Sequence, residues 1–174
     1  ALADYLTIQE KFGTLKGINL AYVGAGNNVA NSLMICGAML GVNVKVCSPN
    51  GFEADSQIVE RAISLSKFGS KISICNDPLQ AVKEAQAVYT DVWASMGQEE
   101  EHFKRKEIFE DFKVDKKLIG LADEEAIILH CLPAHRGEEI TEDVLESKSS
   151  YVFDQAENRL HVQQALLAAQ LGGL

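Results

Sequence analysis

The residues with the clearest chemical potential stand at the end of an apolar run. Residues 126–129 are Ala-Ile-Ile-Leu, and His130, Cys131, Leu132 and Pro133 come directly after them. Continuous apolar runs are typical of buried parallel strands, and a proline cannot donate a hydrogen bond to a neighbouring strand. Ligands of α/β proteins bind beyond the carboxyl ends of such strands. The pattern therefore places an imidazole and a thiol where an α/β protein keeps its chemistry.

Three interpretations of this pair stay open at the level of the residues. Cys131 could be a nucleophile with His130 as its base, but adjacent residues on a strand point to opposite faces, which disfavours that pairing. The two side chains could join His135 as metal ligands, but no second half of a ligand set is evident, so we expect no metal. The simplest interpretation of Cys131 alone is a buried thiol.

The turn Gly24-Ala25-Gly26-Asn27-Asn28 is the second candidate, because it joins an expected strand to an expected helix. Gly-x-Gly in that place is typical of dinucleotide binding. Val29 replaces the third glycine, and residues 46–48 end the second strand without an acidic residue for a ribose. A nicotinamide cofactor is therefore disfavoured, and we expect no cofactor. The alternatives are a plain tight turn, or a turn whose Asn27 and Asn28 amides bind the carboxylate or amino group of a small ligand.

Two charged side chains complete the candidates. Asp91 ends an expected strand and begins a loop, residues 91–97, that contains Ser95, Met96 and Gly97. Its carboxylate could bind a cationic amine, or could merely cap a helix or line the surface. Arg159 lies early in the expected last helix, where its guanidinium could clamp an anion or only pair with Glu157. Trp93 is interpreted as a packing residue.

The elements that must position these residues alternate along the chain. Helical spacing over residues 1–12 ends at Gly13. We predict strands at residues 18–23, 42–47, 71–75, 87–90 and 126–130. We predict helices at residues 29–40, 55–68, 79–85 and 115–122, a charged helix after Gly97, a helix start at 141–145, an extended piece at 151–153 and a closing helix at 154–171. The alternation predicts a Rossmann-like, three-layer α/β domain with a five-stranded parallel sheet, order 3-2-1-4-5, and helices on both faces.

Composition bounds the function classes. The 174 residues are 47% hydrophobic with only three prolines, which indicates one packed domain over residues 1–174. The net charge of −9 disfavours a nucleic-acid partner, and no apolar run approaches a membrane span. The four cysteines have no metal-type spacing and indicate reduced thiols in a cytoplasmic compartment.

Together these segments resemble ornithine carbamoyltransferase, of the aspartate/ornithine carbamoyltransferase family, over essentially the whole chain. The matching motifs are His-Cys-Leu-Pro at residues 130–133, Asp-Val-Trp-Ala-Ser-Met-Gly at 91–97, Gly-Asn-Asn at 26–28 and Ala-Glu-Asn-Arg at 156–159. The opening residues resemble the stretch just after the family's HPxQ motif. The chain thus resembles the second, ornithine-binding domain, cut from a longer protein, and its helix 154–171 would pack toward the missing carbamoyl-phosphate domain.

The resemblance implies roles for the candidate residues. Asn28, Asp91, Ser95 and Met96 would hold ornithine, with Asp91 facing the δ-amine. Cys131 and Leu132 would border both substrates, and Arg159 would reach carbamoyl phosphate. Asp91 and Cys131 would act as catalytic residues that orient the amine and tune its pKa, with Cys131 not a covalent nucleophile. The implied reaction converts carbamoyl phosphate and L-ornithine to L-citrulline and phosphate, in arginine biosynthesis.

The sequence departs from the family pattern in two places, and these departures affect the activity that we expect of the chain. Ala25 stands where the family usually has Asp, so the turn could lack a local hydrogen bond or helix cap. The Ser-Thr-Arg-Thr and HPxQ motifs are absent, so the chain alone is expected to be inactive. The full-length family implies a cytoplasmic homotrimer, or an organelle-matrix one if a transit peptide precedes the domain. The rival interpretations are a putrescine-type carbamoyltransferase and a non-catalytic α/β binding module.

Overall fold

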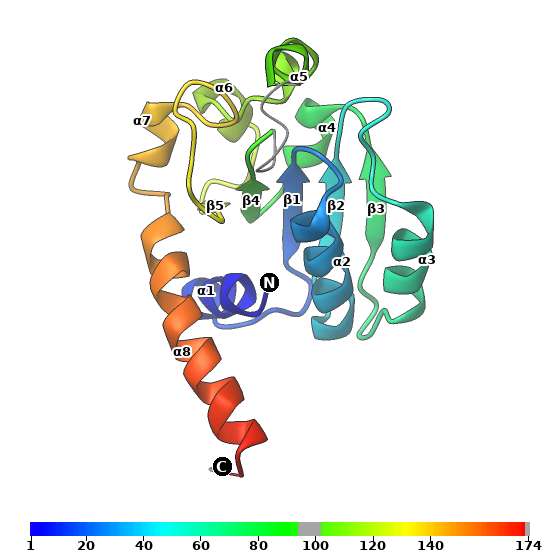
Figure 1. Ribbon diagram of the computed structural model, residues 1–174, viewed down its shortest axis with the longest axis vertical. Helices are drawn as coiled ribbons and strands as arrows, with labels where there is room; N and C mark the ends of the chain where they lie inside the picture. Colours follow the sequence, from blue (N-terminus) through cyan, green and yellow to red (C-terminus); the bar gives the residue numbers. More distant parts are fainter. Residues whose placement is uncertain (94–101, 173–174) are drawn as a thin grey trace.

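A computed structural model of the chain describes residues 1–93 and 102–172 and shows a sheet between two layers of helices (Figure 1). The strands are β1 (Asn19–Val23), β2 (Asn43–Cys47), β3 (Ile72–Cys75), β4 (Ala87–Thr90) and β5 (Ile127–His130). The helices are α1 (Leu2–Phe12), α2 (Asn28–Leu40), α3 (Ser56–Ser64), α4 (Pro78–Val82), α5 (His102–Phe109), the 3-10 helix η2 (Glu110–Phe112), α6 (Lys116–Ile119), α7 (Glu142–Leu145) and α8 (Val152–Gln170). Helices follow strands as the sequence predicted.

The strands pair in the order β3-β2-β1-β4-β5, and each of these pairs is parallel. The predicted order is confirmed. The register aligns the strand ends, because Val23 lies opposite both Cys47 and Thr90, and Thr90 lies opposite His130. The residues that follow β1, β4 and β5 therefore meet along one edge of the sheet, where ligands of α/β proteins bind.

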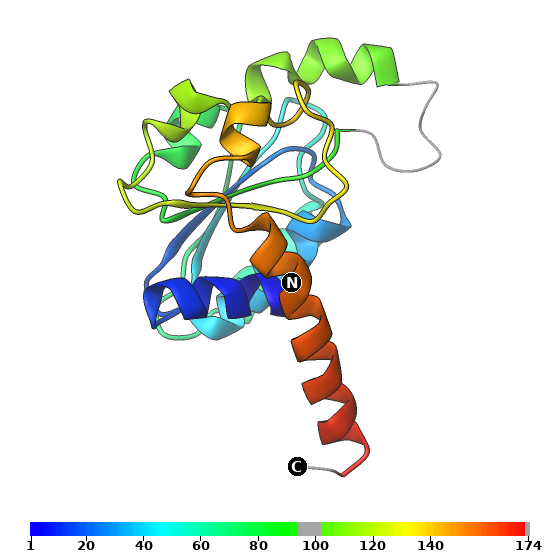
Figure 2. The same cartoon turned by 90° about the vertical axis from the view of Figure 1, so that its left-hand side faces the viewer.

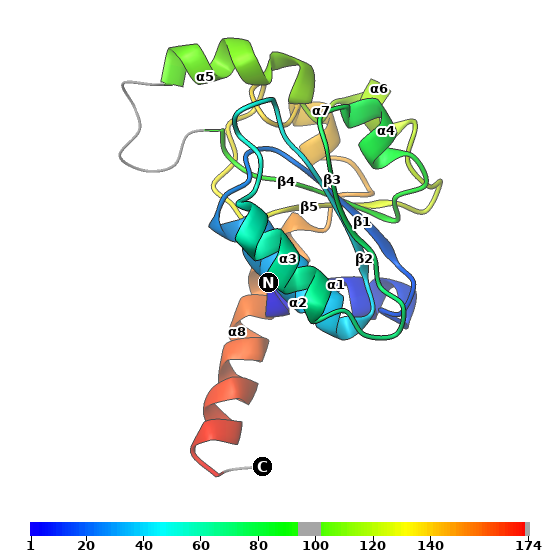
Figure 3. The same cartoon turned by 90° about the vertical axis from the view of Figure 1, so that its right-hand side faces the viewer.

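The pleat of the strands sends alternate side chains into two separate cores. Tyr22, Tyr89 and Leu129 lie in the core shared with α1, α2 and α3. Val23 and Ile128 lie in the opposite core, shared with α4, α6 and α7. Figure 3, which views the sheet from its side, shows α2 and α3 on one side of the strands and α4 and α6 on the other. Helices on both faces of the sheet are thus confirmed.

The helix predicted over residues 55–68 is shorter in the structure. It ends at Ser64, and Phe68 has a left-handed φ of 55°. The Lys67 amide donates to the carbonyl of Ala38 at the end of α2, at 2.8 Å. The Phe68 ring lies 4.1 Å from the Lys16 ammonium. These contacts with other elements pull the chain out of the helix, which local periodicity does not show.

The extended piece predicted at residues 151–153 is wrong beyond its first residue. The Tyr151 amide donates to the Ile128 carbonyl at 2.9 Å, but α8 begins already at Val152. Val152 is buried in the α4–α7 core. Packing of this side chain overrides the strand preference of a Val-Phe pair, because propensity is weak beside tertiary burial.

Helix α8 is docked at its start and projects from the domain at its end (Figure 2). Its buried residues are Val152, Gln155 and Asn158. Farther along, the exposed large apolar side chains are Leu160, Leu166, Leu167 and Leu171. The apolar surface expected on this helix is therefore present. No helix in the described part of the chain is both long and apolar enough to cross a membrane.

Gly37 in α2 offers a test of the packing between α1, α2 and β2. A Cβ at this position would lie 2.4 Å from the Tyr5 hydroxyl and 2.5 Å from Val44 Cγ2. We expect Gly37→Ala to lower the free energy of unfolding by about 1–3 kcal/mol, because overpacking outweighs the better helix propensity of alanine. Urea titration followed by circular dichroism measures the change.

The matched control is Gly120→Ala. Gly120 is exposed and has a φ of −62°, and the nearest atom to its Cβ would be 3.2 Å away. Its stability should change by no more than about 0.5 kcal/mol, as for ordinary surface substitutions. Equal unfolding midpoints for the two variants would show that α2 does not depend on the close contact at Gly37.

Candidate functional site

Asp91 is the centre of a hydrogen-bonded cluster at the carboxyl edge of the sheet. Its Oδ2 accepts from Asn27 Nδ2 at 2.7 Å, and its Oδ1 accepts from the Cys131 thiol at 2.8 Å. The Val92 amide also donates to Oδ1, at 2.7 Å. The side chains that follow β1, β4 and β5 are thus joined through one carboxylate, at the edge where the order β1-β4-β5 brings the strand ends together.

The charge of Asp91 has no cationic partner among the described residues. Asp91 is only 6% exposed, and its three donors are a neutral amide, a thiol and a backbone N–H. A buried carboxylate is stabilised best when its charge is compensated. The cluster therefore favours a positively charged ligand group close by.

The two asparagines of the Gly26–Asn28 turn have different contacts. The Asn27 oxygen caps α2 by accepting from the amides of Val29 and Ala30, so the helix has its cap with Ala25 in the turn. The Asn28 side chain is exposed and lines a cleft. Of the two predicted amides, Asn27 builds the turn and Asn28 faces the cleft.

Gly26 brings this turn close to the loop before α3. Its amide donates to the Phe52 carbonyl at 2.7 Å, and a Cβ would lie 2.1 Å from the Ala54 nitrogen. Backbone atoms cannot move aside as a flexible side chain can, so only glycine fits this position.

His130 and Cys131 point to opposite faces of β5, as strand alternation predicted. His130 Nδ1 accepts from the Leu132 amide at 2.9 Å, so the neutral ring carries its proton on Nε2 and donates it to Glu139 Oε1 at 3.2 Å. Cys131 instead donates to Asp91. His130 is therefore not the base of Cys131, and its ring cannot join Cys131 in one metal site.

Burial and the Asp91 carboxylate raise the pKa of three neighbouring groups, the thiol of Cys131 and the hydroxyls of Tyr22 and Tyr89. Burial raises the pKa of the Cys131 thiol, and the Asp91 carboxylate raises it further. Burial likewise raises the pKa of Tyr22 and of Tyr89, with Asp91 adding to both shifts. Cys131 is thus a neutral hydrogen-bond donor near pH 7, not a thiolate.

Two amide side chains attach α8 to the rest of the domain. Gln155 Oε1 accepts from the His130 amide at 2.9 Å, while its Nε2 donates to Asp4 Oδ1 at 2.7 Å. Asn158 Nδ2 donates to the Thr7 hydroxyl at 3.0 Å and to Glu10 at 2.7 Å. These bonds fix the start of α8, and with it the backbone of Arg159, beside the end of β5.

An open cleft of about 510 Å³ lies between α1, α2 and α8. Asn28, Tyr89, Cys131 and Arg159 are among its lining residues, and an adjoining hollow is lined by Cys131, Leu132 and Arg159. The Arg159 side chain is exposed and makes no hydrogen bond or ion pair with another described side chain; Glu157, its expected partner, instead lies 3.8 Å from His161. A cleft with a few convergent polar groups is the usual form of a small-molecule site.

The structure brings together most, but not all, of the predicted site residues. Asn28, Cys131 and Arg159 face the cleft, and Leu132 faces the adjoining hollow. Asp91 lies behind Cys131 and does not line the cleft. Ser95 and Met96 fall outside the described residues.

Trp93 is a packing residue, as predicted. It is buried, and its ring centroid lies 5.9 Å from that of Phe109. Sequence reasoning missed Gln155 and Glu139. Gln155 had a usable signal, because it is spaced three residues from both Val152 and Asn158 on one helical face. Glu139 lies in a loop without periodicity and had none.

Comparison with known proteins identifies the family. The family description "Aspartate/ornithine carbamoyltransferase, Asp/Orn binding domain" matches residues 16–170. The ornithine carbamoyltransferase of Prochlorococcus marinus is 66% identical over all 174 residues, which cover 55% of its length. The chain therefore spans about half the length of the curated relatives it matches.

Solved structures give the same result. Ornithine carbamoyltransferase from Pyrococcus furiosus superposes with a TM-score of 0.94 at 52% identity, covering 99% of this chain and 56% of that one. Anabolic ornithine carbamoyltransferase from Campylobacter jejuni superposes with a TM-score of 0.91 at 36% identity, covering 99% and 58%. The chain belongs to the aspartate/ornithine carbamoyltransferase family and corresponds to its Asp/Orn-binding domain.

Proposed function

We propose that this domain binds L-ornithine and forms half of the active site of an ornithine carbamoyltransferase, which makes citrulline and phosphate from ornithine and carbamoyl phosphate. The single observation that supports this most is the Asp91 cluster, where a buried carboxylate with neutral donors lies behind a cleft-facing thiol. An ornithine δ-ammonium beside Cys131 would supply the cation that Asp91 lacks among the described residues. The names of the relatives favour ornithine over putrescine as the substrate.

The proposed mechanism assigns Asp91 and Cys131 to the attacking amine. The δ-ammonium must lose a proton before its nitrogen attacks the carbonyl carbon of carbamoyl phosphate. Asp91 and the neutral Cys131 thiol would orient the amine and influence its pKa. Attack gives a tetrahedral intermediate, and its collapse expels phosphate. Cys131 forms no covalent bond in this scheme, which is consistent with its raised pKa.

The remaining residues would hold the ends of the two substrates. Asn28 lines the cleft from the first turn of α2, and it would hydrogen-bond the α-carboxylate or α-amino group of ornithine. Ser95 and Met96 are proposed ornithine contacts on the resemblance alone. Arg159 would pair with carbamoyl phosphate through its guanidinium, and Cys131 and Leu132 would border the carbamoyl group.

We propose that the projecting part of α8 packs against a carbamoyl-phosphate domain in the full-length protein. Its four leucines Leu160, Leu166, Leu167 and Leu171 are 48–84% exposed, and such apolar surfaces mark interfaces. The trimer and the cytoplasmic location implied by the resemblance stay predictions, as does the role in arginine biosynthesis.

Ligand binding by the 174-residue chain tests the ornithine site. We expect calorimetry to show that ornithine binds more tightly than putrescine, which has no carboxylate to reach Asn28. Asp91→Asn should weaken ornithine binding about tenfold to a hundredfold, because it removes the buried negative charge behind Cys131 that would attract the δ-ammonium. A colorimetric assay should find no citrulline, since the chain contains no Ser-Thr-Arg-Thr or HPxQ segment.

Asp143→Asn is the matched control for the charge change. Asp143 is half exposed and lies 3.1 Å from Lys116, away from the residues that line the cleft. Its ornithine affinity should equal that of the unmodified chain. Circular dichroism of both variants separates a binding defect from misfolding. Unchanged ornithine affinity in a folded Asp91→Asn variant would refute the proposed role of Asp91.

Thiol alkylation tests the protonation state of Cys131. A hydrogen bond from the Cys47 thiol lowers the pKa of Cys75 to about 7, whereas burial and Asp91 raise the pKa of Cys131. At pH 8, iodoacetamide should therefore modify Cys75 before Cys131, because the thiolate is the reactive form. Peptide mass spectrometry over time gives both rates.

The same experiment on Asp91→Asn isolates the effect of the carboxylate. Removing the negative charge should lower the pKa of Cys131 and so raise its alkylation rate. The rate at Cys75 serves as the internal control and should not change. Cys131 that reacts first in the unmodified chain would argue for an activated nucleophile instead.

The exposed leucines of α8 can be tested in the isolated chain. Leu167→Lys combined with Leu171→Lys should reduce the fluorescence of a bound apolar dye, while the free energy of unfolding stays within about 0.5 kcal/mol. Leu79→Lys is the control, because Leu79 is an exposed leucine on α4. Equal dye binding by all three proteins would argue against an interface on α8.

A further inference from the structure

Glu139 is a fully buried carboxylate whose two oxygens have unequal contacts. Its side chain is 0% exposed. Oε1 accepts from His130 Nε2 at 3.2 Å and from the His135 amide at 2.5 Å. Oε2 is buried and has no hydrogen-bond partner among the described residues. A buried carboxylate oxygen without a donor is costly, so it calls for a missing positive group.

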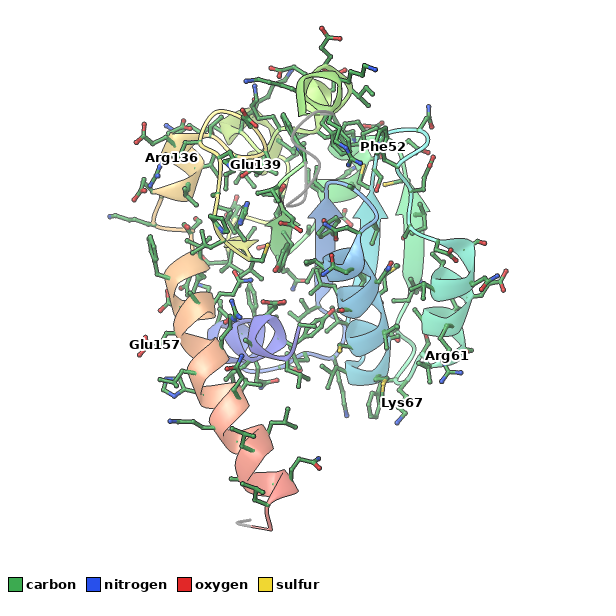
Figure 4. The ribbon with its side chains drawn as sticks, viewed as in Figure 1. Phe52, Arg61, Lys67, Arg136, Glu139 and Glu157 are labelled. Atoms are coloured by element: carbon green, nitrogen blue, oxygen red, sulfur yellow. The ribbon has the colours of Figure 1, made fainter. Side chains whose placement is uncertain are left out.

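The side chains beside this oxygen are of types that can ligate a metal ion. His135 Nδ1 lies 3.7 Å from Glu139 Oε2. One ligand atom each from His135, Glu138 and Glu139 lies within 4.8 Å of the others. Glu138 contacts Lys106 Nζ at 3.3 Å. Figure 4 shows Glu139 in the loop between β5 and α7, with Arg136 farther out.

We propose that His135, Glu138 and Glu139 bind a divalent transition-metal ion, with Zn²⁺, Co²⁺ and Mn²⁺ as the suitable class. One imidazole and two carboxylates suit these ions better than Ca²⁺ or Mg²⁺, which prefer oxygen ligands alone. Ligands at about 2.0–2.2 Å from Zn²⁺ stand closer together than these atoms do. His135 is 53% exposed and can rotate to close the site. Water would complete the coordination.

This site is distinct from the three-residue set that the sequence first suggested. Cys131 lies on the other face of β5, and both nitrogens of His130 are occupied. His130 is instead a neighbour of the metal ligand Glu139, through Oε1. Such outer hydrogen bonds orient a ligand and are part of a metal site.

Two hydrogen bonds connect the proposed metal site to the cleft. Glu139 holds His130, and His130 Nδ1 holds the amide of Leu132, which borders the cleft-side hollow. An ion that joins His135 to Glu139 would therefore stiffen the whole loop from Leu132 to Glu139. Metal binding by His135, Glu138 and Glu139 does not depend on ornithine binding.

Co²⁺ titration of the purified chain, followed by visible absorption, tests the proposal. We expect saturable binding with the spectrum of nitrogen and oxygen ligands. Sulfur ligands would be recognised by charge-transfer absorption in the near ultraviolet. His135→Ala and Glu139→Gln should each weaken binding at least about tenfold. His135→Ala removes an exposed side chain and should fold normally. It therefore tests the site even if Glu139→Gln fails to fold.

His161→Ala is the matched control, because His161 is another exposed histidine beside a glutamate, Glu157, at 3.8 Å. It should leave the Co²⁺ affinity unchanged. Hydrogen exchange provides a second readout, since bound Co²⁺ should slow exchange in the peptide 133–140 of the unmodified chain and not in His135→Ala. Absence of binding at millimolar Co²⁺, a purely sulfur-type spectrum, or equal affinity in His135→Ala would each overturn the proposal.

Discussion

The hydrogen bond between the Cys131 thiol and the Asp91 carboxylate is the contact on which the rest of the site depends. It joins the ends of β4 and β5, and Asn27 extends it to the start of α2. The two partners support each other, because the carboxylate raises the pKa of the thiol and the thiol donates a hydrogen bond to the carboxylate. The result is a polar cluster inside a packed edge of the sheet. A buried network of this kind is stable only when each member is satisfied, which ties its geometry to the surrounding strands.

His130 and Cys131, at the end of β5, make contacts on opposite faces of the sheet. Cys131 turns toward α1 and α2 and the cleft, while His130 turns toward the loop between β5 and α7. Leu132 has a left-handed φ of 53°, which bends the chain sharply between them and the following loop. Such a conformation in a residue other than glycine persists when its surroundings hold it, here through the bond from its amide to His130. One short sequence therefore serves two separate sets of contacts.

Much of the fold was readable from the sequence because its signals are local and repeated. Apolar runs marked the five strands, and the alternation with helices fixed their order. The predicted order placed the strands that precede Asp91 and Cys131 side by side, but it did not predict the hydrogen bond between the two side chains. The features that stayed hidden depend on contacts across the fold: Phe68 ends α3 early through contacts with α2 and Lys16, and Val152 starts α8 through burial in a core. The different contacts of Asn27 and Asn28 likewise depend on where Asp91 lies, which the turn itself does not encode. Glu139 had no sequence signal, since its partners are set by the path of one loop.

Helix α8 contains neither Gly nor Pro between Val152 and Gln170. Such a helix has no preferred bending point. Its buried Gln155 and its exposed Leu167 are separated by 12 residues, or about 18 Å of helix. Gln155 accepts a hydrogen bond from the His130 amide, so one continuous helix connects the outer leucines to the end of β5. A force that tilts the outer half of α8 would therefore also act on the hydrogen bond between Gln155 and the end of β5, about 18 Å away.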